Sequence, residues 1–173
     1  AGKDPRVVEL ILQESQSVIR VRPGLIITEH RTGHILANAG IDASNTGVDA
    51  ASGDDVVLLW PRDPDASARA LSEAVSGALG YHVPVVINDS LGRPWRMGTV
   101  GFAIGVAGLE PVWDQVGERD LDGRTMQVTA PAMADALAAA ASLVQGETDQ
   151  GTPVVWAEGC PLRVNEQASS RAL

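Results

Sequence analysis

The chain has 173 residues, a formal net charge of −9 and a hydrophobic fraction of 45%, of which aromatic residues are a small part. This length fits one domain, whose core must be built mostly from Val, Leu, Ile and Ala. An acidic surface argues against nonspecific binding to nucleic acid or to anionic membranes. It leaves anionic small molecules open as substrates, provided that metal ions and local arginines reverse the charge at the site.

Cysteine content and hydropathy indicate in which cellular compartment the protein is expected. The single cysteine, Cys160, excludes an internal disulfide and favours a reducing compartment, so we expect a cytoplasmic protein. No apolar run is long enough to span a bilayer, and residues 1–5 (AGKDP) do not lead into the hydrophobic segment of a signal peptide. Neither a membrane nor a nucleic acid is therefore expected as a partner.

In the N-terminal third, Asp4 before Pro5 is typical of an N-cap followed by proline at the first helical position. With the apolar residues that follow on one face, it predicts a helix over about residues 4–15. After it we expect a strand over 17–22, a hairpin of 25–30 and 34–37, a polar loop over 42–54, and a buried strand over 56–60.

The remainder begins with a second helix, which Asp63 and Pro64 start and Gly80 ends. Its predicted inward face comprises Ala68, Leu71, Val75, Ala78 and Leu79. Further along we expect strands over 83–87, 101–109 and 153–157, a turn over 120–123, a helix over 130–144 and a polar, frayed tail after Pro161. The small residues of 101–109 indicate close backbone packing or a bend. Strands and helices do not alternate strictly, so the fold class is α+β, with mixed sheets and packed helices in a single domain over 1–173 that ends in the polar tail, 160–173.

Two short acidic stretches carry the candidate chemistry: GIDASN at 40–45 and INDSLGRPWR at 87–96. Each places a carboxylate, Asp42 or Asp89, beside a hydroxyl or amide on a predicted loop. Oxygen ligands with guanidinium groups nearby suit a divalent metal that holds a phosphorylated substrate. The alternative for Asp42 is an Asx-turn with its own backbone. The alternative for Arg93 and Arg96 is a surface pair whose loop is anchored by Trp95.

Other polar groups point less strongly to chemistry. His30, His34 and Glu29 resemble a zinc set without the usual closed coordination, and ordinary hairpin-end histidines are the competing interpretation. Cys160 has no predicted partner base, which disfavours a catalytic thiol. Residues 146–151 (GETDQG) follow a helix and are either its C-cap and loop or the source of a third acidic ligand, Glu147. No P-loop or dinucleotide-binding motif is present.

Taken together, these segments resemble the coenzyme F420-0:L-glutamate ligases, also called F420 gamma-glutamyl ligases. The resemblance is collinear up to about Gly159, and its most specific part is GIDASN combined with NDSLGRPWR and VGFAIGVAGL. The other matching segments are KDPRVVELILQES, RPGLIITEHRTGHILANAGIDASN, LLWPRDPDASARAL and ALAAAASLVQGETDQGTPVV.

The resemblance implies an activity and its partners. Members of this family add L-glutamate to the carboxylate of the deazaflavin precursor F420-0 and convert GTP to GDP and phosphate. They require Mn²⁺ or Mg²⁺ and are helped by K⁺. Their fold is an unusual α+β one that forms an intertwined homodimer. The expected reaction proceeds through an acyl phosphate, because a carboxylate is a poor electrophile until it is phosphorylated.

The resemblance also implies roles for individual residues. Metal ligands would be Asp42, Asp89 and Ser90, with Glu147 as a candidate for a further one. Asn45 would contact the nucleotide, and the loop with Gly146, Glu147 and Asp149 would line the nucleotide site. To Arg93 and Arg96 we assign an electrostatic role in catalysis, offsetting charge on phosphate or on the acceptor carboxylate.

Family members usually carry a further N-terminal segment with a lysine-containing portion that also contacts the nucleotide, and this chain begins after the position of that segment. Two alternatives to the ligase therefore stay open. One is a fragment or homologue that binds metal and nucleotide without turnover, and the other is a ligase for a different acceptor. The sequence does not give the number of glutamates added.

Overall fold

The computed structural model describes residues 2–47 and 56–173 and contains both helices and antiparallel sheets. This confirms the predicted α+β class. Its contacts divide the chain into two compact units, which are described separately. Unit 1 comprises Ala1–Arg62 and Leu91–Thr99, and unit 2 comprises Asp63–Ser90 and Val100–Leu173. The single domain expected over 1–173 stays a prediction.

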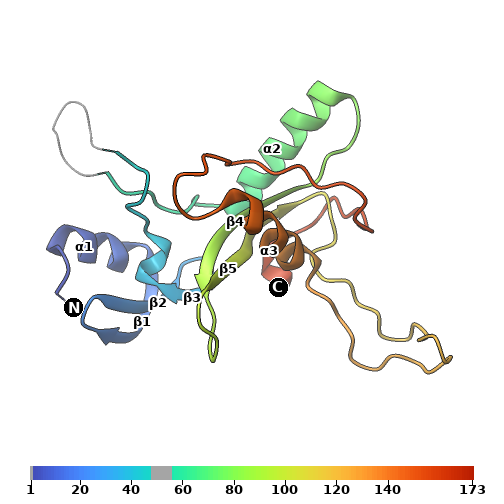
Figure 1. Ribbon diagram of the computed structural model, residues 1–173, viewed down its shortest axis with the longest axis horizontal. Coiled ribbons are helices and arrows are strands. Elements are labelled where there is room, and N and C mark those ends of the chain that lie inside the picture. Colours follow the sequence, from blue (N-terminus) through green and yellow to red (C-terminus); the bar gives the residue numbers. More distant parts are fainter. Residues whose placement is uncertain (1, 48–55) are drawn as a thin grey trace. The chain divides into compact units, whose positions relative to one another are not determined.

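Unit 1 is a helix packed on a small antiparallel sheet (Figure 1). Helix α1 (Pro5–Gln13) begins where Asp4 accepts a hydrogen bond of 2.8 Å from the backbone N–H of Arg6, which is the predicted cap. The strands are β1 (Ser15–Arg22), β2 (Leu25–His30) and β3 (Ile35–Ala37), paired in the order β1-β2-β3 and followed by the short 3-10 helix η1 (Asn38–Gly40). Because strand residues alternate between faces, β2 directs Ile26 toward a core that it shares with Ile11 and Ala39.

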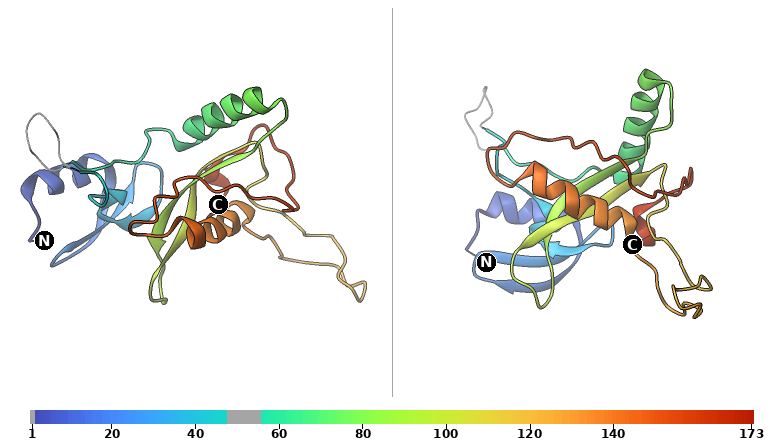
Figure 2. Two further views of the ribbon diagram at one scale, coloured as in Figure 1. Left: turned by 45° about the horizontal axis from the view of Figure 1, so that its top comes forward. Right: turned by 45° about the vertical axis from the view of Figure 1, so that its right-hand side comes forward.

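Unit 2 is a two-stranded sheet, β4 (Val85–Gly92) with β5 (Thr99–Ala107), and its helices are α2 (Pro64–Leu79), α3 (Met133–Gln145) and the short 3-10 helix η2 (Ser170–Ala172). Helix α3 lies beside β5 (Figure 1). The core here comprises Val106 of β5 and Leu109 just after it, with Ala134 and Ala138 of α3. A long excursion between β5 and α3 extends away from the sheet (Figure 2).

Small residues in β5 let two helices approach the strand. A Cβ atom at Gly101 would collide with the backbone carbonyl of Ala138 in α3, and one at Gly105 would collide with that of Pro64 at the start of α2. The close packing predicted for this segment is thereby confirmed, and it explains why a run of small side chains forms a buried strand.

Two predicted strands do not form. Within 56–60 a single antiparallel bridge joins Leu58 to Asp42, and Leu58 and Leu59 are exposed while Trp60 is buried. Residues 153–157 have no regular structure. The prediction failed because an apolar run forms a strand only where a partner strand offers backbone hydrogen bonds, which composition alone does not reveal.

The inward face of α2 also differs from the prediction. Ala68 is buried as expected, but its buried neighbours are Asp65 and Ser72, whereas Leu71 and Leu79 are about half exposed. The burial of Ser72 leaves no hydroxyl without a partner, because this hydroxyl donates a hydrogen bond to the carbonyl of Val83 at 2.6 Å. In the described part of the chain, no helix combines the length and apolar character that a bilayer crossing requires.

The segment after Pro161 is packed, contrary to the prediction of a frayed tail. Ala168 is buried in the core of unit 2, and the carbonyl of Arg163 accepts from the N–H of Glu110 at 2.8 Å. The Arg163 guanidinium lies 4.2 Å over the Trp113 ring. Polar composition suggested fraying, but these polar groups have specific partners that a single sequence does not identify.

Candidate functional site

The second acidic stretch lies within strand β4, not on a loop after it. The strand continues through Asn88, Asp89 and Ser90 to Gly92. Alternation along a strand places Asn88 and Ser90 on one face and Asp89 on the other. The backbone N–H of Ser90 donates to Asp89 Oδ1 at 2.7 Å, so this carboxylate is turned along the strand. The predicted loop is wrong because pairing with β5 extends the strand through these polar residues, although polar residues often end a strand.

Unit 2 brings two of the predicted metal ligands together. The hydroxyl of Ser90 donates to Glu147 Oε2 at 3.0 Å, across a sequence separation of 57 residues. Glu147 reaches this position from the loop that follows α3. The contact joins the end of β4 to that loop, which only the tertiary structure reveals.

The loop over 146–151 is internally ordered. Gly146 has φ 70° and ψ −176°, a conformation essentially restricted to glycine. The side chain of Gln150 lies where a Cβ atom of residue 146 would be, and its Oε1 accepts from the N–H of Thr148 at 2.9 Å. Asp149, expected at the nucleotide, accepts from the Thr148 hydroxyl at 3.2 Å and is exposed.

A pair of side-chain amides that the sequence analysis did not single out for a role lies beside these groups. Asn88 Nδ2 donates to Gln145 Oε1 at 2.8 Å, and Gln145 Nε2 donates back to Asn88 Oδ1 at 3.3 Å. The only signal in the sequence is a polar residue at the end of an alanine-rich helix, directly before a glycine. That pattern is typical of many helix ends, so it does not single out Gln145.

The first acidic stretch belongs to unit 1. Asp42 Oδ1 accepts from the N–H of Ser44 at 2.8 Å, which is the Asx-turn bond of the alternative interpretation. This bond uses one carboxylate oxygen and does not exclude metal binding. Asn45 adopts a positive φ of 55°, which asparagine tolerates better than most residues. The part of the predicted loop at 48–54 lies outside the described residues.

The arginine segment also belongs to unit 1. Arg93 Nη1 is shielded from solvent and has no hydrogen-bond partner among the described residues, whereas Arg96 is exposed. Trp95 is 99% exposed and has a φ of 57°, so it does not anchor the loop as the surface-pair alternative required. A buried guanidinium nitrogen without a partner suits an anionic ligand.

The predicted site residues thus fall into two sets. Unit 1 holds Asp42, Asn45, Arg93 and Arg96, and unit 2 holds Asp89, Ser90, Gly146, Glu147 and Asp149. Each unit is described by itself, and the roles of Asp42 and Asp89 as metal ligands stay predictions. Among the described residues, no three His, Cys, Asp or Glu side chains gather into a metal-binding group. The donors of unit 2 are carboxylates and a hydroxyl, the oxygen ligands that Mg²⁺ and Mn²⁺ prefer, so their chemistry fits such an ion.

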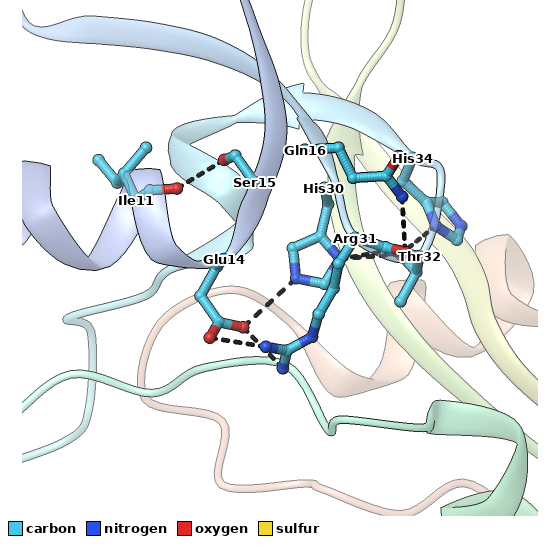
Figure 3. Close-up of polar contacts among 8 residues, drawn as sticks. All are labelled: Ile11, Glu14, Ser15, Gln16, His30, Arg31, Thr32 and His34. Carbon is cyan, nitrogen blue, oxygen red and sulfur yellow. Dashed lines mark hydrogen bonds and ion pairs between the residues drawn. The ribbon is translucent and has the colours of Figure 1, made fainter.

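The histidines of the β2–β3 hairpin form a polar cluster of a different kind (Figure 3). His30 is fully buried, and its Nε2 lies 3.6 Å from Glu14 Oε2, while Arg31 Nη1 donates to Glu14 Oε1 at 2.8 Å. Thr32 Oγ1 lies between Nδ1 of His30 and Nδ1 of His34, at 2.8 and 2.9 Å. Glu29, the third member of the zinc interpretation, instead accepts from Ser17 at 2.9 Å. The cluster therefore joins the end of α1 to the hairpin.

Acidification should destabilise this cluster. Burial lowers the pKa of His30, the positive charge of Arg31 lowers it further, and Glu14 opposes the shift. The native state then binds fewer protons than the unfolded state, so stability is complete above the unfolded pKa of about 6.5 and falls as the pH drops below it. We expect His30→Gln to be less stable at neutral pH and to show a shallower loss between about pH 6.5 and 5.

Urea unfolding at a series of pH values measures this slope. Tryptophan fluorescence is a suitable signal because the Trp60 ring centroid lies 4.9 Å from that of His30. Gln16→Leu is the matched control, since it removes the 2.9 Å bond to the carbonyl of Arg31 but no titrating group. An unchanged slope in His30→Gln would show that another group causes the acid sensitivity.

A shallow apolar depression of about 140 Å³ lies elsewhere in unit 1, lined by Arg20, Arg22, Leu25 and Ile27. None of the predicted site residues lines it. Leu25 and Ile27 alternate along β2 with the buried Ile26 and Thr28, so the depression is on the face of the sheet away from the core.

Most of the chain is similar in sequence to known proteins. A family model described as F420-0:Gamma-glutamyl ligase matches residues 1–159. A coenzyme F420:L-glutamate ligase of Methanothermobacter thermautotrophicus is 51% identical over 92% of this chain and 61% of its own length. The protein of the same name from Methanopyrus kandleri is 50% identical over 91% and 60%, and that from Natronomonas pharaonis 48% over 88% and 55%.

This chain therefore spans about three fifths of the length of these relatives. The matched region contains both acidic stretches, the arginine segment and the loop after α3. Since the family model covers nearly all of the sequence, the chain belongs to the F420-0:gamma-glutamyl ligase family.

Proposed function

We propose that the protein is, or is the principal part of, a GTP-dependent ligase that adds L-glutamate to coenzyme F420-0. Membership of the family and the ligase names of relatives at about 50% identity support the reaction class. The structural observation that carries the proposal is the hydrogen bond between Ser90 and Glu147, because it joins two expected metal-binding oxygen donors from distant parts of the sequence.

The proposed reaction has two steps. An oxygen of the acceptor carboxylate attacks the γ-phosphorus of GTP, the bond to the β-phosphate oxygen breaks, and GDP leaves. The amine of L-glutamate then attacks the acyl-phosphate carbon, phosphate leaves with the bonding electron pair, and the amine loses a proton to give the amide. The chain supplies mainly position and charge, as is usual in phosphoryl transfer.

Each group of residues has a distinct part in this proposal. Mn²⁺ or Mg²⁺, when bound, supplies positive charge that offsets the triphosphate. Ser90 and Glu147 lie together and would hold one ion. Asp89, on the opposite face of β4, and Asp42, in unit 1, are the other expected metal ligands. Asn45 and the loop with Gly146 and Asp149 would contact the nucleotide. Arg93 Nη1, for which the described residues supply no hydrogen-bond partner, would bind phosphate or acceptor carboxylate together with Arg96. K⁺, a homodimer and a cytoplasmic location are part of the same proposal.

The test is mass spectrometry of F420-0 incubated with the chain, GTP, Mn²⁺ and L-glutamate. Stepwise addition of glutamyl groups is expected, with a loss of at least about 100-fold in Asp42→Ala and Asp89→Ala if each removes a metal ligand. Asp122→Ala is the matched control, because it removes an exposed carboxylate from the excursion of unit 2 and should leave turnover unchanged.

The arginine variants separate charge stabilisation from metal binding. Arg93→Ala and Arg96→Ala should keep Mn²⁺ binding and lower glutamyl addition strongly; near-normal turnover would remove both from the mechanism. If the unaltered chain binds Mn²⁺ and GTP but adds no glutamate to F420-0, the outcome is binding without turnover. Addition to another carboxylate acceptor under the same conditions would replace F420-0 as the substrate.

A further inference from the structure

Beside the Ser90–Glu147 contact, unit 2 contains a second cross-link with the same sequence separation. Asn88 pairs with Gln145 and Ser90 pairs with Glu147, each across 57 residues. Asn88 and Ser90 are two positions apart on β4 and therefore lie on the same face of the strand. The two contacts form a short polar ladder between the strand and the chain that leaves α3.

Gln145 occupies a position from which it holds both ends of the loop. It is the last residue of α3, directly before Gly146, where the backbone turns away from the helix. Its Oε1 accepts from Asn88, and its Nε2 lies 3.3 Å from Asn88 Oδ1 and 3.4 Å from the carbonyl of Pro153, beyond the loop. The side-chain amide of Gln145 thus connects the end of α3 to Asn88 on β4 and to Pro153, which follows the loop.

From this geometry we propose that Asn88 and Gln145 are positioning residues. They fasten residues 146–152, which are the loop over 146–151 and Thr152 after it, to β4 and thereby set the place of Glu147. Neither residue needs to touch the substrate for this. The pair is half-buried, so its hydrogen bonds are partly protected from competition by water. Glu147 itself is exposed, so its place depends on its hydrogen bond to Ser90 and on the loop backbone. The consequence for metal affinity rests on the proposed function; the fastening of the loop does not.

Hydrogen exchange followed by mass spectrometry tests the fastening directly. In Asn88→Leu and Gln145→Leu, the amides of 146–152 should exchange at least about ten-fold faster, whereas those of β5 keep the rate of the unaltered chain. Gln145→Glu keeps an acceptor for the 2.8 Å bond from Asn88 Nδ2 and should restore part of the protection. Asn165→Ala is the matched control. It removes the 2.8 Å hydrogen bond from the side-chain amide of Asn165 to Glu110 in the same unit, and it leaves the loop unaltered.

A Mn²⁺ titration of the same variants adds the functional readout. Removing a hydrogen bond that orients a metal ligand typically weakens affinity by about 10–100-fold, so Asn88→Leu and Gln145→Leu should fall in this range and Asn165→Ala should not. If the unaltered chain binds no Mn²⁺, the metal site of the proposed function fails, and the exchange rates still decide whether the pair fastens the loop.

Two results would overturn the proposal. One is an unchanged exchange rate over 146–152 in both leucine variants. The other is an equal acceleration in the loop and in β5, which indicates general destabilisation of the unit. If a leucine variant fails to fold, Asn88→Ser and Gln145→Glu replace it in the comparison of exchange rates between residues 146–152 and β5. The shorter side chain of Asn88→Ser cannot reach Gln145, so this variant should show the larger acceleration in residues 146–152.

Discussion

Replacing Asp65 with alanine should lower the free energy of unfolding of unit 2 by roughly 3 kcal/mol, because several buried or half-buried donors lose a charged acceptor. Asp65 is 8% exposed. Its carboxylate accepts from the N–H of Val106 at 2.9 Å, the hydroxyl of Ser169 at 2.7 Å and the N–H of Ser170 at 3.0 Å. One side chain at the start of α2 therefore joins β5 to the C-terminal segment.

The destabilisation caused by Asp65→Ala should be smaller in acid than at neutral pH. Burial acts to raise the pKa of Asp65, but the hydrogen bonds from Ser170, Val106 and Ser169 outweigh it, and the pKa is lowered below its usual value of 3.8. A lowered pKa contributes stability that is present above about pH 4 and is lost as the pH falls through the folded-state value. The difference between the unaltered chain and Asp65→Ala should therefore narrow in acid.

Urea unfolding at pH 7 and in acid measures both the loss of unfolding free energy in Asp65→Ala and its decrease at low pH. Asp122→Ala is the control for the loss of an exposed carboxylate. Hydrogen exchange should also show the segment that contains Ser169 and Ser170 released in Asp65→Ala, since Asp65 binds both residues. Unfolding free energies equal within error at pH 7 would show that the C-terminal segment is held by its apolar contacts alone.

The second large effect is expected for Gly146→Ala, which should displace the loop over 146–151. If Glu147 is a metal ligand, the variant should also reduce the proposed glutamyl addition by at least about 100-fold. The conformation at φ 70° and ψ −176° costs a residue with a Cβ about 1–3 kcal/mol. The new methyl group would also collide with the side chain of Gln150, which orders the loop through Thr148. Both effects favour a different backbone path, which moves Glu147 away from Ser90.

Gly123→Ala is the matched control for strain alone. Gly123 has a positive φ of 80°, but a Cβ there meets nothing within 4 Å. The double variant Gly146→Ala with Gln150→Ala removes the collision and keeps the strain, so its activity should lie between those of the single Gly146→Ala variant and the unaltered chain. Activity and Mn²⁺ affinity are measured side by side; full activity in Gly146→Ala would remove the loop conformation from the mechanism.

Much of the local structure follows from the sequence, because the interactions that determine it are short-range. Asp4 and Asp63 cap helices whose first residues are prolines, and Gly80 ends α2 in the left-handed conformation. Residues 25–30 and 35–37 form the antiparallel hairpin around residues 31–34, close to the predicted strands. Such signals act within a few residues, so a single sequence displays them in full.

Predictions that depended on a distant partner were less reliable. The apolar run at 56–60 found no continuous partner strand, while the polar residues Asn88, Asp89 and Ser90 became part of β4 because β5 pairs with them. Asp65 is buried although its sequence position, in the first turn of a helix, is equally typical of a charge that interacts only with the helix dipole. Its function as an acceptor depends on residues more than a hundred positions away in sequence.

The sequence by itself determined the α+β class, the family and the residue types that carry the candidate chemistry, since these are encoded in composition, caps and collinear motifs. Only the tertiary structure decided that Ser90 meets Glu147, that Asn88 pairs with Gln145, and that Asp89 lies on the other face of β4. The physical reason is that these contacts join segments 57 residues apart, and their geometry is determined by how α3 packs on β5 and by where Gly146 turns the chain.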